Sequence, residues 1–483
     1  MKINLKKFIG DKAFYKMLIA ITIPIMVQNG ITNLVNLLDN IMVGRLGTEA
    51  MSGVSIVNQF IFIYMLVVFG ATAGAGIFTA QYYGNGDNDG IRNTFRIKFI
   101  VNAAVAITAS VIFLAFDEEL VQTFLTAENS EGDIEATMQY AKDYLAIMVI
   151  GLLPNAVGFA YTSTMRETGD AVTPMVSSLM AVAVNFVLNL ILIFGLFGVP
   201  AMGVVGAAIA TVTSRFVELF IVLFKMYRHT DKYPYIVGAL RSMRIPAALI
   251  KKIARKGLPL MANELFWSIS ITVRNQAYST RGLETVAAQN MTQTFFNFIT
   301  VIYMALSTSL SILVGARLGA GEIETAKDYN RKILTFTMLV SLGLSGILCI
   351  AAPFYPMIYN TTDTAKDLCT YFLFILAALV PFSAFAHASY FTLRTGGKIL
   401  ITIIMDSLYM WVIVVPCSLI LANFTSLPIE LLYPICQSVE LLKIFIAAFF
   451  ILKGNWASRL VSDEEKLQKT EINQETETTD CQV

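Results

Sequence analysis

The chain has 483 residues, of which 56% are hydrophobic and only 14% are charged, and its formal net charge is +1. Soluble proteins carry about a quarter charged residues, so this composition excludes an ordinary soluble domain. No basic stripe with interleaved aromatic residues is present, which excludes nucleic acid as a partner. We therefore expect a protein whose main partner is the lipid bilayer.

Apolar runs long enough to cross a bilayer recur along the whole chain. A membrane-spanning helix needs about 20 mostly apolar residues, and residues 171–214 contain no charged side chain at all. The fold class predicted is therefore all-α integral membrane, with twelve transmembrane helices. Their expected limits are 17–42, 50–79, 97–116, 137–161, 172–195, 203–226, 257–279, 285–314, 333–358, 368–391, 399–421 and 431–452. The seventh and twelfth are interrupted by charged residues: Glu264, Arg274, Glu440 and Lys443.

The charges of the loops predict the orientation. Lys and Arg accumulate on cytoplasmic loops, and residues 225–256 carry nine basic residues against one acid. Residues 117–135, on the opposite side of the predicted helices, carry seven acids and no base. We therefore expect a multi-pass protein of the cell (inner) membrane with both termini in the cytoplasm.

The same pattern predicts three cytoplasmic segments. Residues 1–16 form an N-terminal segment, residues 227–256 a linker and residues 453–483 a polar tail. Within that tail, residues 463–483 are polar enough that we expect them to be disordered.

The two halves of the chain resemble one another. A shift of 235 residues places Pro24 on Pro259, Asn40 on Asn275, Gly84 on Gly319 and Gly86 on Gly321. We therefore predict an N-terminal six-helix bundle, 17–226, and a C-terminal six-helix bundle, 257–452. Because six spans separate the repeats, both bundles enter the membrane in the same direction and are related by a pseudo-two-fold axis along the membrane normal. This is the parallel-repeat plan of transporters, with the substrate path between the bundles; a duplication kept for packing alone is the alternative.

Amide side chains recur at helical spacing in the N-terminal half. The first predicted helix carries Asn29, Asn33, Asn36 and Asn40, with Asp39 beside them, and the fifth carries Asn185 and Asn189 one turn apart. These intervals put the amides of the first helix on one face, and a polar face is costly against lipid. We interpret it as the wall of a wet cavity. The alternatives are amides that join helices, worth about 0.6 kcal/mol each, and an Asp39 that only caps the helix end.

The seventh and eighth predicted helices repeat this pattern with charges added. Glu264, Ser268, Asn275 and Ser279 follow one another on the seventh, and Gln289 and Gln293 lie on the eighth. An intramembrane carboxylate can hold a proton, a metal cation or a cationic substrate, and competition among these is the physical basis of antiport. Glu264 could instead form an ion pair with a neighbouring helix.

Two further charges have structural interpretations. Arg274 occupies the position of Asp39 in the repeat, so an ion pair between the bundles, functional or purely structural, is one interpretation. Asp406 is interpreted as structural, satisfying the backbone or Trp411.

Other chemistry has little support in the sequence. Gly70-x-x-x-Gly74 and Gly315-x-x-x-Gly319 are motifs of close helix packing. The five cysteines form no CxxC pair, which argues against a metal or disulfide framework. No P-loop, HExxH or Ser-His-Asp arrangement is present, so we expect no enzyme and no cofactor.

Several segments together resemble the multidrug and toxic compound extrusion (MATE) transporters. They are 39–44 (DNIMVG), 81–87 (QYYGNGD), 166–170 (RETGD), 185–195 (NFVLNLILIFG), 203–211 (GVVGAAIAT) and 314–321 (VGARLGAG). The resemblance covers about residues 14–452, and the order of the segments makes it specific. It implies a monomeric secondary active multidrug exporter that moves small organic, often cationic, substrates against protons or sodium by alternating access.

The resemblance also implies site residues. The family's acid on the first helix matches Asp39, so we expect the coupling ion, H⁺ or Na⁺, at Asp39. In one branch an Asn and an Asp on the fifth helix and a Thr on the sixth join it; here Asn185 and Thr211 match, but Asn189 replaces the acid. The expected coupling-ion set is Asp39, Asn36, Asn40, Asn185, Asn189 and Thr211, with Na⁺ as the candidate metal.

Another branch of the family uses acids on the seventh and tenth helices. Glu264 lies nearly one turn from the first of these positions, and Ser383 occupies the second. The expected substrate or cation set in the C-terminal half is Glu264, Asn275, Gln289 and Gln293.

Two rival functions differ in what they require. A lipid-linked oligosaccharide flippase of related architecture would need basic residues in the N-terminal bundle to meet pyrophosphate, and its predicted spans offer only Arg215 away from the loops. A non-transporting receptor or scaffold would need surface for a partner, and the loops are short.

Overall fold

The computed structural model describes residues 7–124 and 133–461. Every regular element within these residues is a helix. The first half contains α1 (Lys12–Gly44), α2 (Thr48–Gly84), α3 (Asn88–Ala115), α4 (Asp117–Gln122), α5 (Ile134–Glu167), α6 (Val172–Phe194) and α7 (Gly203–Arg228). The second contains α8 (Ala247–Ser279), α9 (Leu283–Gly319), α10 (Ile323–Ala351), α11 (Asp363–Thr395), α12 (Ile399–Ile403), α13 (Val415–Phe424), α14 (Ile429–Leu441) and α15 (Lys443–Leu452).

The number of long helical segments among the described residues agrees with the expected twelve spans. Among the described residues, eleven helical segments are long and apolar enough to cross a membrane, and two of these are composite: Ile399–Phe424 and Ile429–Leu452. The remaining long helix is α8, which has 33 residues and carries charges along its length. Adding α8 to the eleven gives the predicted twelve, and the all-helical membrane fold is confirmed.

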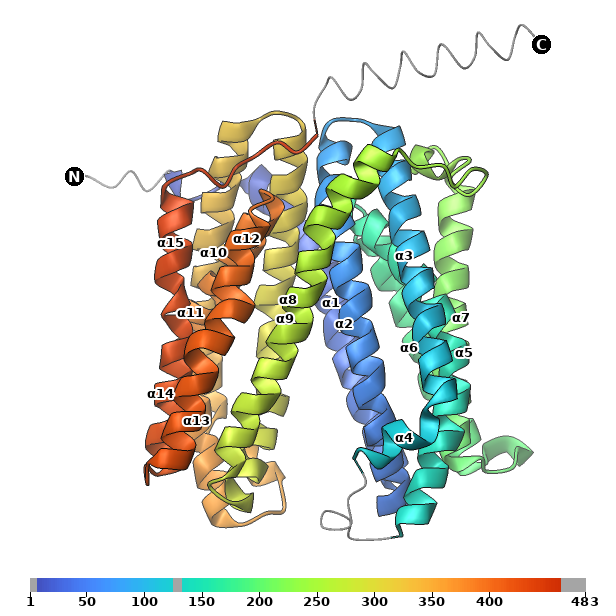
Figure 1. Ribbon diagram of the computed structural model, residues 1–483, viewed down its shortest axis with the longest axis vertical. Coiled ribbons are helices and arrows are strands. Elements are labelled where there is room, and N and C mark those ends of the chain that lie inside the picture. The colour runs from blue at the N-terminus through green and yellow to red at the C-terminus, as the bar shows by residue number, and fades with distance from the viewer. Residues whose placement is uncertain (1–6, 125–132, 462–483) are drawn as a thin grey trace, which may run out of the picture.

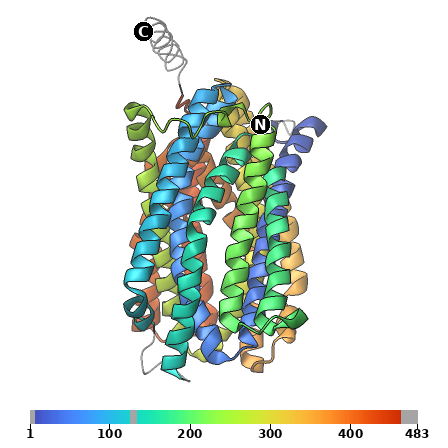
Figure 2. The ribbon, with the colours of Figure 1, turned by 90° about the vertical axis from the view of Figure 1, so that its right-hand side faces the viewer.

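The helices form two halves that meet at one end of the molecule (Figure 1). Helices α1–α7 lie in one half and α8–α15 in the other. The first and last described residues lie at the same end, which we call the terminal end, and the ribbons of the two halves converge there and diverge toward the opposite end. Seen from the side, the long helices run nearly parallel to the long axis (Figure 2).

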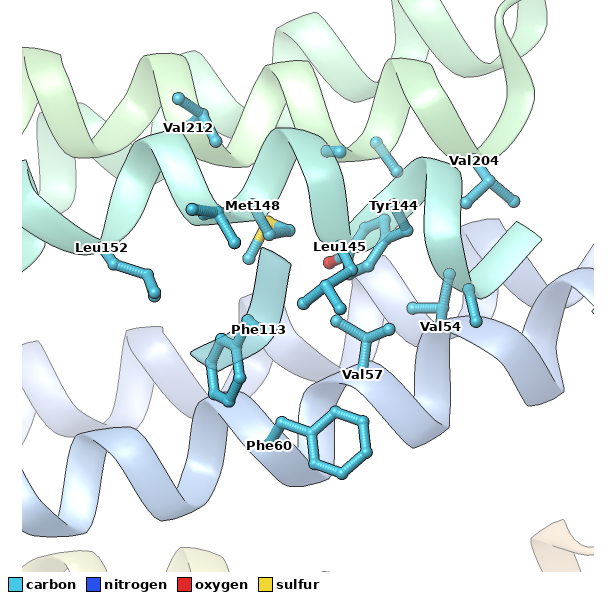
Figure 3. Packing of buried hydrophobic residues seen from close by; sticks show 14 of the residues in the cluster. Val54, Val57, Phe60, Phe113, Tyr144, Leu145, Met148, Leu152, Val204 and Val212 are labelled. Carbon is cyan, nitrogen blue, oxygen red and sulfur yellow. The ribbon is translucent and has the colours of Figure 1, made fainter. Parts of the chain in front are cut away.

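Apolar packing holds each half together. In the N-terminal half, Val54, Val57 and Phe60 of α2 pack against Phe113 of α3 and Leu145 of α5 (Figure 3). Large apolar side chains also cover the outer surface, as expected where lipid replaces water. The stability of each half therefore rests on close packing of helices rather than on hiding apolar residues from water.

Glycines allow the two halves to touch backbone to backbone. Cβ atoms added at Gly70 and Gly74 of α2 would lie 2.7 Å from Met261 Cα and 2.3 Å from Gly257 Cα of α8. Nearer the terminal end, a Cβ at Gly84 would lie 1.8 Å from the Ala316 carbonyl oxygen of α9. The Gly70–Gly74 motif is therefore a close-packing motif, as predicted.

The loop between α5 and α6 is tied to the connection between the halves through Asp170. Lys232 Nζ donates to Asp170 Oδ2 at 2.7 Å, Thr173 Oγ1 donates to the same oxygen at 2.8 Å, and the Tyr233 hydroxyl donates to it as well. Burial alone would raise the pKa of Asp170, but hydrogen bonds from Lys232, Tyr233 and Thr173 outweigh it and hold the pKa below its usual range.

Two predicted boundaries differ from the structure. The predicted linker 227–256 is partly helical, because α8 begins at Ala247. The predicted polar tail begins with residues 454–461, which we call the terminal strap and which pack against the helices; Trp456 is 3% exposed. The polar composition of the tail did not predict this packing, because a few apolar side chains such as Trp456 can anchor a largely polar segment against the helices. The predicted disorder of 463–483 falls outside the described residues.

Candidate functional site

Helices α1, α6 and α7 bring Asp39 together with three polar side chains. Asn189 Nδ2 donates to Asp39 Oδ1 at 2.6 Å and lies 3.3 Å from Asn185 Oδ1. Asn185 Nδ2 in turn donates to Thr211 Oγ1 at 3.3 Å. The one-turn spacing of the two asparagines makes this chain of contacts, because residues four apart on a helix lie one above the other. Four of the six residues expected around the coupling ion are therefore connected.

The oxygens of this site suit a hard cation or a proton. Asn189 is 1% exposed, and its Oδ1 accepts no hydrogen bond from any described residue. A buried polar atom without a partner is costly, and a bound cation or a protonated carboxyl would supply one. Carboxylate, amide and hydroxyl oxygens are the ligands that hard cations prefer, so the residues fit Na⁺ as well as H⁺.

Asn36 and Asn40 are not joined to this chain of contacts. Both are exposed on α1, and neither hydrogen-bonds to Asp39 among the interactions of the described residues. Asn40 points elsewhere because adjacent residues on a helix are rotated by about 100°. Their part in the site stays a prediction.

In the C-terminal half, Glu264 pairs with Arg394 of α11, as the ion-pair alternative for Glu264 had it, although the sequence did not identify its partners. The Tyr390 hydroxyl donates to Glu264 Oε1 at 3.2 Å, and Arg394 Nη1 lies 3.9 Å from the same oxygen. Next to Glu264 on α8, Asn263 Nδ2 donates to Asp406 Oδ2 at 2.8 Å. These contacts connect α8 with α11 and with the helical segment that follows it.

Asp406 lies in a widened part of its helix. Between α12 and α13 the backbone forms two π-helical stretches, η5 (Ile404–Leu408) and η6 (Met410–Val414), a feature frequent at functional sites. The interpretation of Asp406 as a partner of Trp411 is wrong, because Trp411 Nε1 donates to the Phe266 carbonyl oxygen at 2.9 Å. The signal that the sequence offered for Asp406 was an acid within an otherwise apolar run. Asp406 comes near Glu264 only through the fold, because the two residues are far apart in the sequence.

Arg394 places the cluster at the junction of the halves. Its guanidinium lies 5.5 Å from the ring centre of Phe69 on α2 and 5.2 Å from that of Phe391. Arg394 therefore contacts the N-terminal half through an aromatic face while it faces Glu264 in the C-terminal half. A change in the charge of Glu264 would act at the contact between the halves.

The other residues predicted to act with Glu264 lie far from it. Asn275 is eleven residues further along α8, a rise of about 16 Å, and Gln289 and Gln293 lie near the start of α9, toward the opposite end. Gln293 Nε2 donates to Asn297 Oδ1 at 2.8 Å. These polar residues therefore lie toward the opposite end, away from Glu264.

The interpretation of Arg274 as an ion pair between the bundles is wrong. Arg274 is 8% exposed and forms an ion pair with Glu440 of α14 within the C-terminal half. Lys443 Nζ also contacts Glu440, at 3.3 Å. Because α14 brings a carboxylate beside α8, the buried charge is paired locally. The repeat aligned Arg274 with Asp39, but it did not predict that Arg274 pairs with Glu440.

Gln81 of α2 links both halves to the terminal strap. Its side-chain nitrogen lies 3.4 Å from the Thr395 carbonyl oxygen and 3.3 Å from that of Ser458, and its oxygen accepts from Leu460 N at 2.7 Å. Arg459 Nε donates to the Gly319 carbonyl oxygen at 3.1 Å. The terminal end is therefore closed by packed glycines and buried hydrogen bonds. Gln81 is the first residue of the 81–87 segment (QYYGNGD), from which no role in closing the terminal end was predicted.

Two helical halves with an acidic site in each, packed across a close junction, define the class of duplicated-bundle membrane transporters. The chain belongs to the MatE family, whose sequence profile matches residues 24–191 and 259–420. The profile thus matches once in each half.

Two named relatives extend over nearly the whole chain. "Probable multidrug resistance protein NorM" of Thermotoga maritima is 24% identical over 458 residues, which cover 94% of this chain and 96% of the relative. "Probable multidrug resistance protein YoeA" of Bacillus subtilis is 22% identical over 449 residues, covering 91% and 94%.

Two solved structures share the fold. One is a MOP superfamily transporter from Pyrococcus furiosus, with a TM-score of 0.80 and 20% identity, covering 94% of this chain and 98% of that chain. The other is an outward-facing multidrug resistance MATE family transporter, with a TM-score of 0.80 and 21% identity, covering 94% and 97%.

Proposed function

We propose that this chain is a secondary active multidrug exporter of the cell membrane, working as a monomer. It would expel small organic, often cationic, compounds against an inward flow of protons or sodium. The observation that carries the proposal is the chain of contacts from Asp39 through Asn189 and Asn185 to Thr211. The two relatives above are both named as probable multidrug resistance proteins, and these names support the proposal.

The terminal end is assigned to the cytoplasm. The nine basic residues of 225–256 lie at this end, and basic loops remain on the cytoplasmic side. With the terminal end closed, the conformation is outward-facing. Cargo would leave and the coupling ion would enter from the opposite end.

Asp39 would take the coupling ion. A proton or Na⁺ arriving from outside neutralises the Asp39 carboxylate and gives the unpartnered Asn189 Oδ1 a partner. Na⁺ would contact this oxygen directly. A protonated Asp39 would donate a hydrogen bond to it after the Asn189 amide has rotated. A cationic cargo attracted by the acids of both halves then loses the part of that attraction that Asp39 supplies, and departs. Release of the ion to the cytoplasm would restore the charge for the next cargo.

Glu264 and Asp406 would attract cationic cargo in the C-terminal half. With Arg394 included, the cluster keeps one formal negative charge, and a flat cation would compete with Arg394 for the Phe69 and Phe391 rings. Asn275, Gln289 and Gln293 would line the exit route.

The test is efflux of a fluorescent organic cation from proteoliposomes, with pH and sodium gradients varied separately. Asp39→Asn should lose efflux under the gradient that drives the wild type, and Glu264→Gln should weaken cargo binding. Asp363→Asn, which neutralises an exposed acid at the opposite end, is the matched control and should behave as wild type.

Unimpaired gradient-driven efflux by Asp39→Asn would remove the coupling assignment. The rivals give different results in the same vesicles: a scaffold moves no dye under any gradient, and a flippase moves lipid-linked sugar but no dye.

A further inference from the structure

A cavity of about 780 Å³ opens between the first turns of α8 and the junction of α11 with α12, toward the terminal end. Five cationic side chains line it: Lys251, Lys252, Arg255, Lys256 and Lys398. None of the described residues that line the cavity is acidic. Like charges gathered in one cavity repel one another, so an anion there would stabilise it.

Among the described residues, three of these cations, Lys251, Arg255 and Lys398, have no carboxylate partner. Lys256 Nζ donates to the Gly397 carbonyl oxygen at 2.7 Å, which is a neutral acceptor. Across the described chain, no carboxylate forms an ion pair with Lys251, Arg255 or Lys398. Other cations near the terminal end do have such partners: Lys232 lies 2.7 Å from Asp170, and Arg317 lies 3.0 Å from Glu322. The positive-inside pattern explains basic residues at this end, but it does not explain why Lys251, Arg255 and Lys398 converge with no paired acid among the described residues.

The surroundings of the cavity are apolar and face outward. Ala248 and residues 399–401 complete its wall. Leu400 is 71% exposed and Leu258 60% exposed, on a lateral face where lipid tails replace water. A ligand that fits must therefore combine a negative head with an apolar body.

We propose that this cavity binds the phosphate of an anionic phospholipid, with Lys251, Arg255 and Lys398 around the headgroup and the acyl chains along Leu400 and Leu258. Basic recesses between helices on the cytoplasmic side bind anionic headgroups in this way. Free phosphate shares the headgroup chemistry but would leave the apolar flank without a partner. Because α8 also packs against α2, the bound lipid would lie beside the junction of the halves.

The test counts phosphatidylglycerol bound to the purified full-length chain by native mass spectrometry, with phosphatidylcholine as the neutral probe. The variant Lys251→Gln/Arg255→Gln/Lys398→Gln should bind phosphatidylglycerol at least about tenfold more weakly, since each cation near an anionic headgroup contributes about fivefold. Phosphatidylcholine binding should not change.

The matched control, Lys225→Gln/Arg228→Gln/Arg241→Gln, removes the same charge from the same end and should bind as the wild type. Lys398→Arg, which keeps the charge, should also retain binding, and this separates a charge effect from misfolding.

Three results would overturn the proposal. They are equal weakening in both triple variants, displacement of the lipid by millimolar inorganic phosphate, and lipid binding that occurs only after residues 462–483 are removed. The last result would assign the cavity to the chain's own acidic C-terminus.

Discussion

Gly84→Ala tests how the terminal end stays closed. An alanine Cβ at this position would lie 1.8 Å from the Ala316 carbonyl oxygen, whereas carbon and oxygen in contact keep at least about 3.3 Å. Helices α2 and α9 would therefore have to separate by about 1.5 Å at this point. Overpacking of this kind costs about 1–3 kcal/mol, so the closed form should lose population by a factor of about 5 to 150 relative to the open one.

The assay is pulsed EPR between spin labels at positions 89 and 324, which are exposed on α3 and α10 directly after the two turns at the junction. In Gly84→Ala the distance distribution should shift toward longer separations. Gly343→Ala on α10 is the matched control, because a Cβ there meets no atom within 4 Å. A distribution for Gly84→Ala that matches the wild type would refute the idea that this contact closes the terminal end.

Three further predictions address packing, pH and the strap. Arg274→Ala leaves the partly buried Glu440 paired with Lys443 alone and should lower the free energy of unfolding by less than the about 3–5 kcal/mol that a wholly unpaired buried charge costs, measured by thermal denaturation in detergent, with Arg274→Lys retaining part of it. Because hydrogen bonds hold the pKa of Asp170 below 3.8, its contribution to stability is present above about pH 4 and lost as the pH falls further; Asp170→Asn should remove this acid-dependent loss. Gln81→Ala breaks hydrogen bonds to the strap, should cost about 1–3 kcal/mol, and should speed proteolysis within 454–461.

The sequence predicted the elements well because their signals are local. Apolar runs of fixed length identify spans, and α8 was found despite Glu264 and Arg274, which exclude it from a search by hydropathy alone. The spacing of Asn185 and Asn189 placed two amides on one face, and the structure connects them to Asp39. Here periodicity along one helix was sufficient.

Partners on other helices could not be predicted in the same way. The neighbours of Glu264 depend on how α11 is rotated against α8, and no periodicity in either segment contains that angle. Asp406 was undervalued for the same reason, because it is more than 140 residues from Asn263 along the chain and 2.8 Å from it in space. Arg274 shows a different error. The repeat aligned Arg274 with Asp39, but the helix beside Arg274 is α14 of the same half, not a helix of the other half.

The chemical difference between the two acidic sites bears on which of them couples transport to an ion. Asp39 accepts a hydrogen bond from the neutral amide of Asn189, and no described residue forms an ion pair with it, so binding one proton or one Na⁺ changes the formal charge of that carboxylate from negative to neutral. Around Glu264 the guanidinium of Arg394 already supplies a counter-charge at 3.9 Å. A cation arriving there competes with the guanidinium of Arg394, which also contacts the rings of Phe69 and Phe391 and is therefore not readily displaced. Each bound monovalent ion adds one positive charge at either site, but at Asp39 it leaves the carboxylate neutral, whereas at Glu264 it leaves Arg394 without its paired carboxylate. Losing the carboxylate at Asp39 should abolish coupling, while losing Glu264 should mainly alter cargo affinity and leave the dependence on the ion gradient in place.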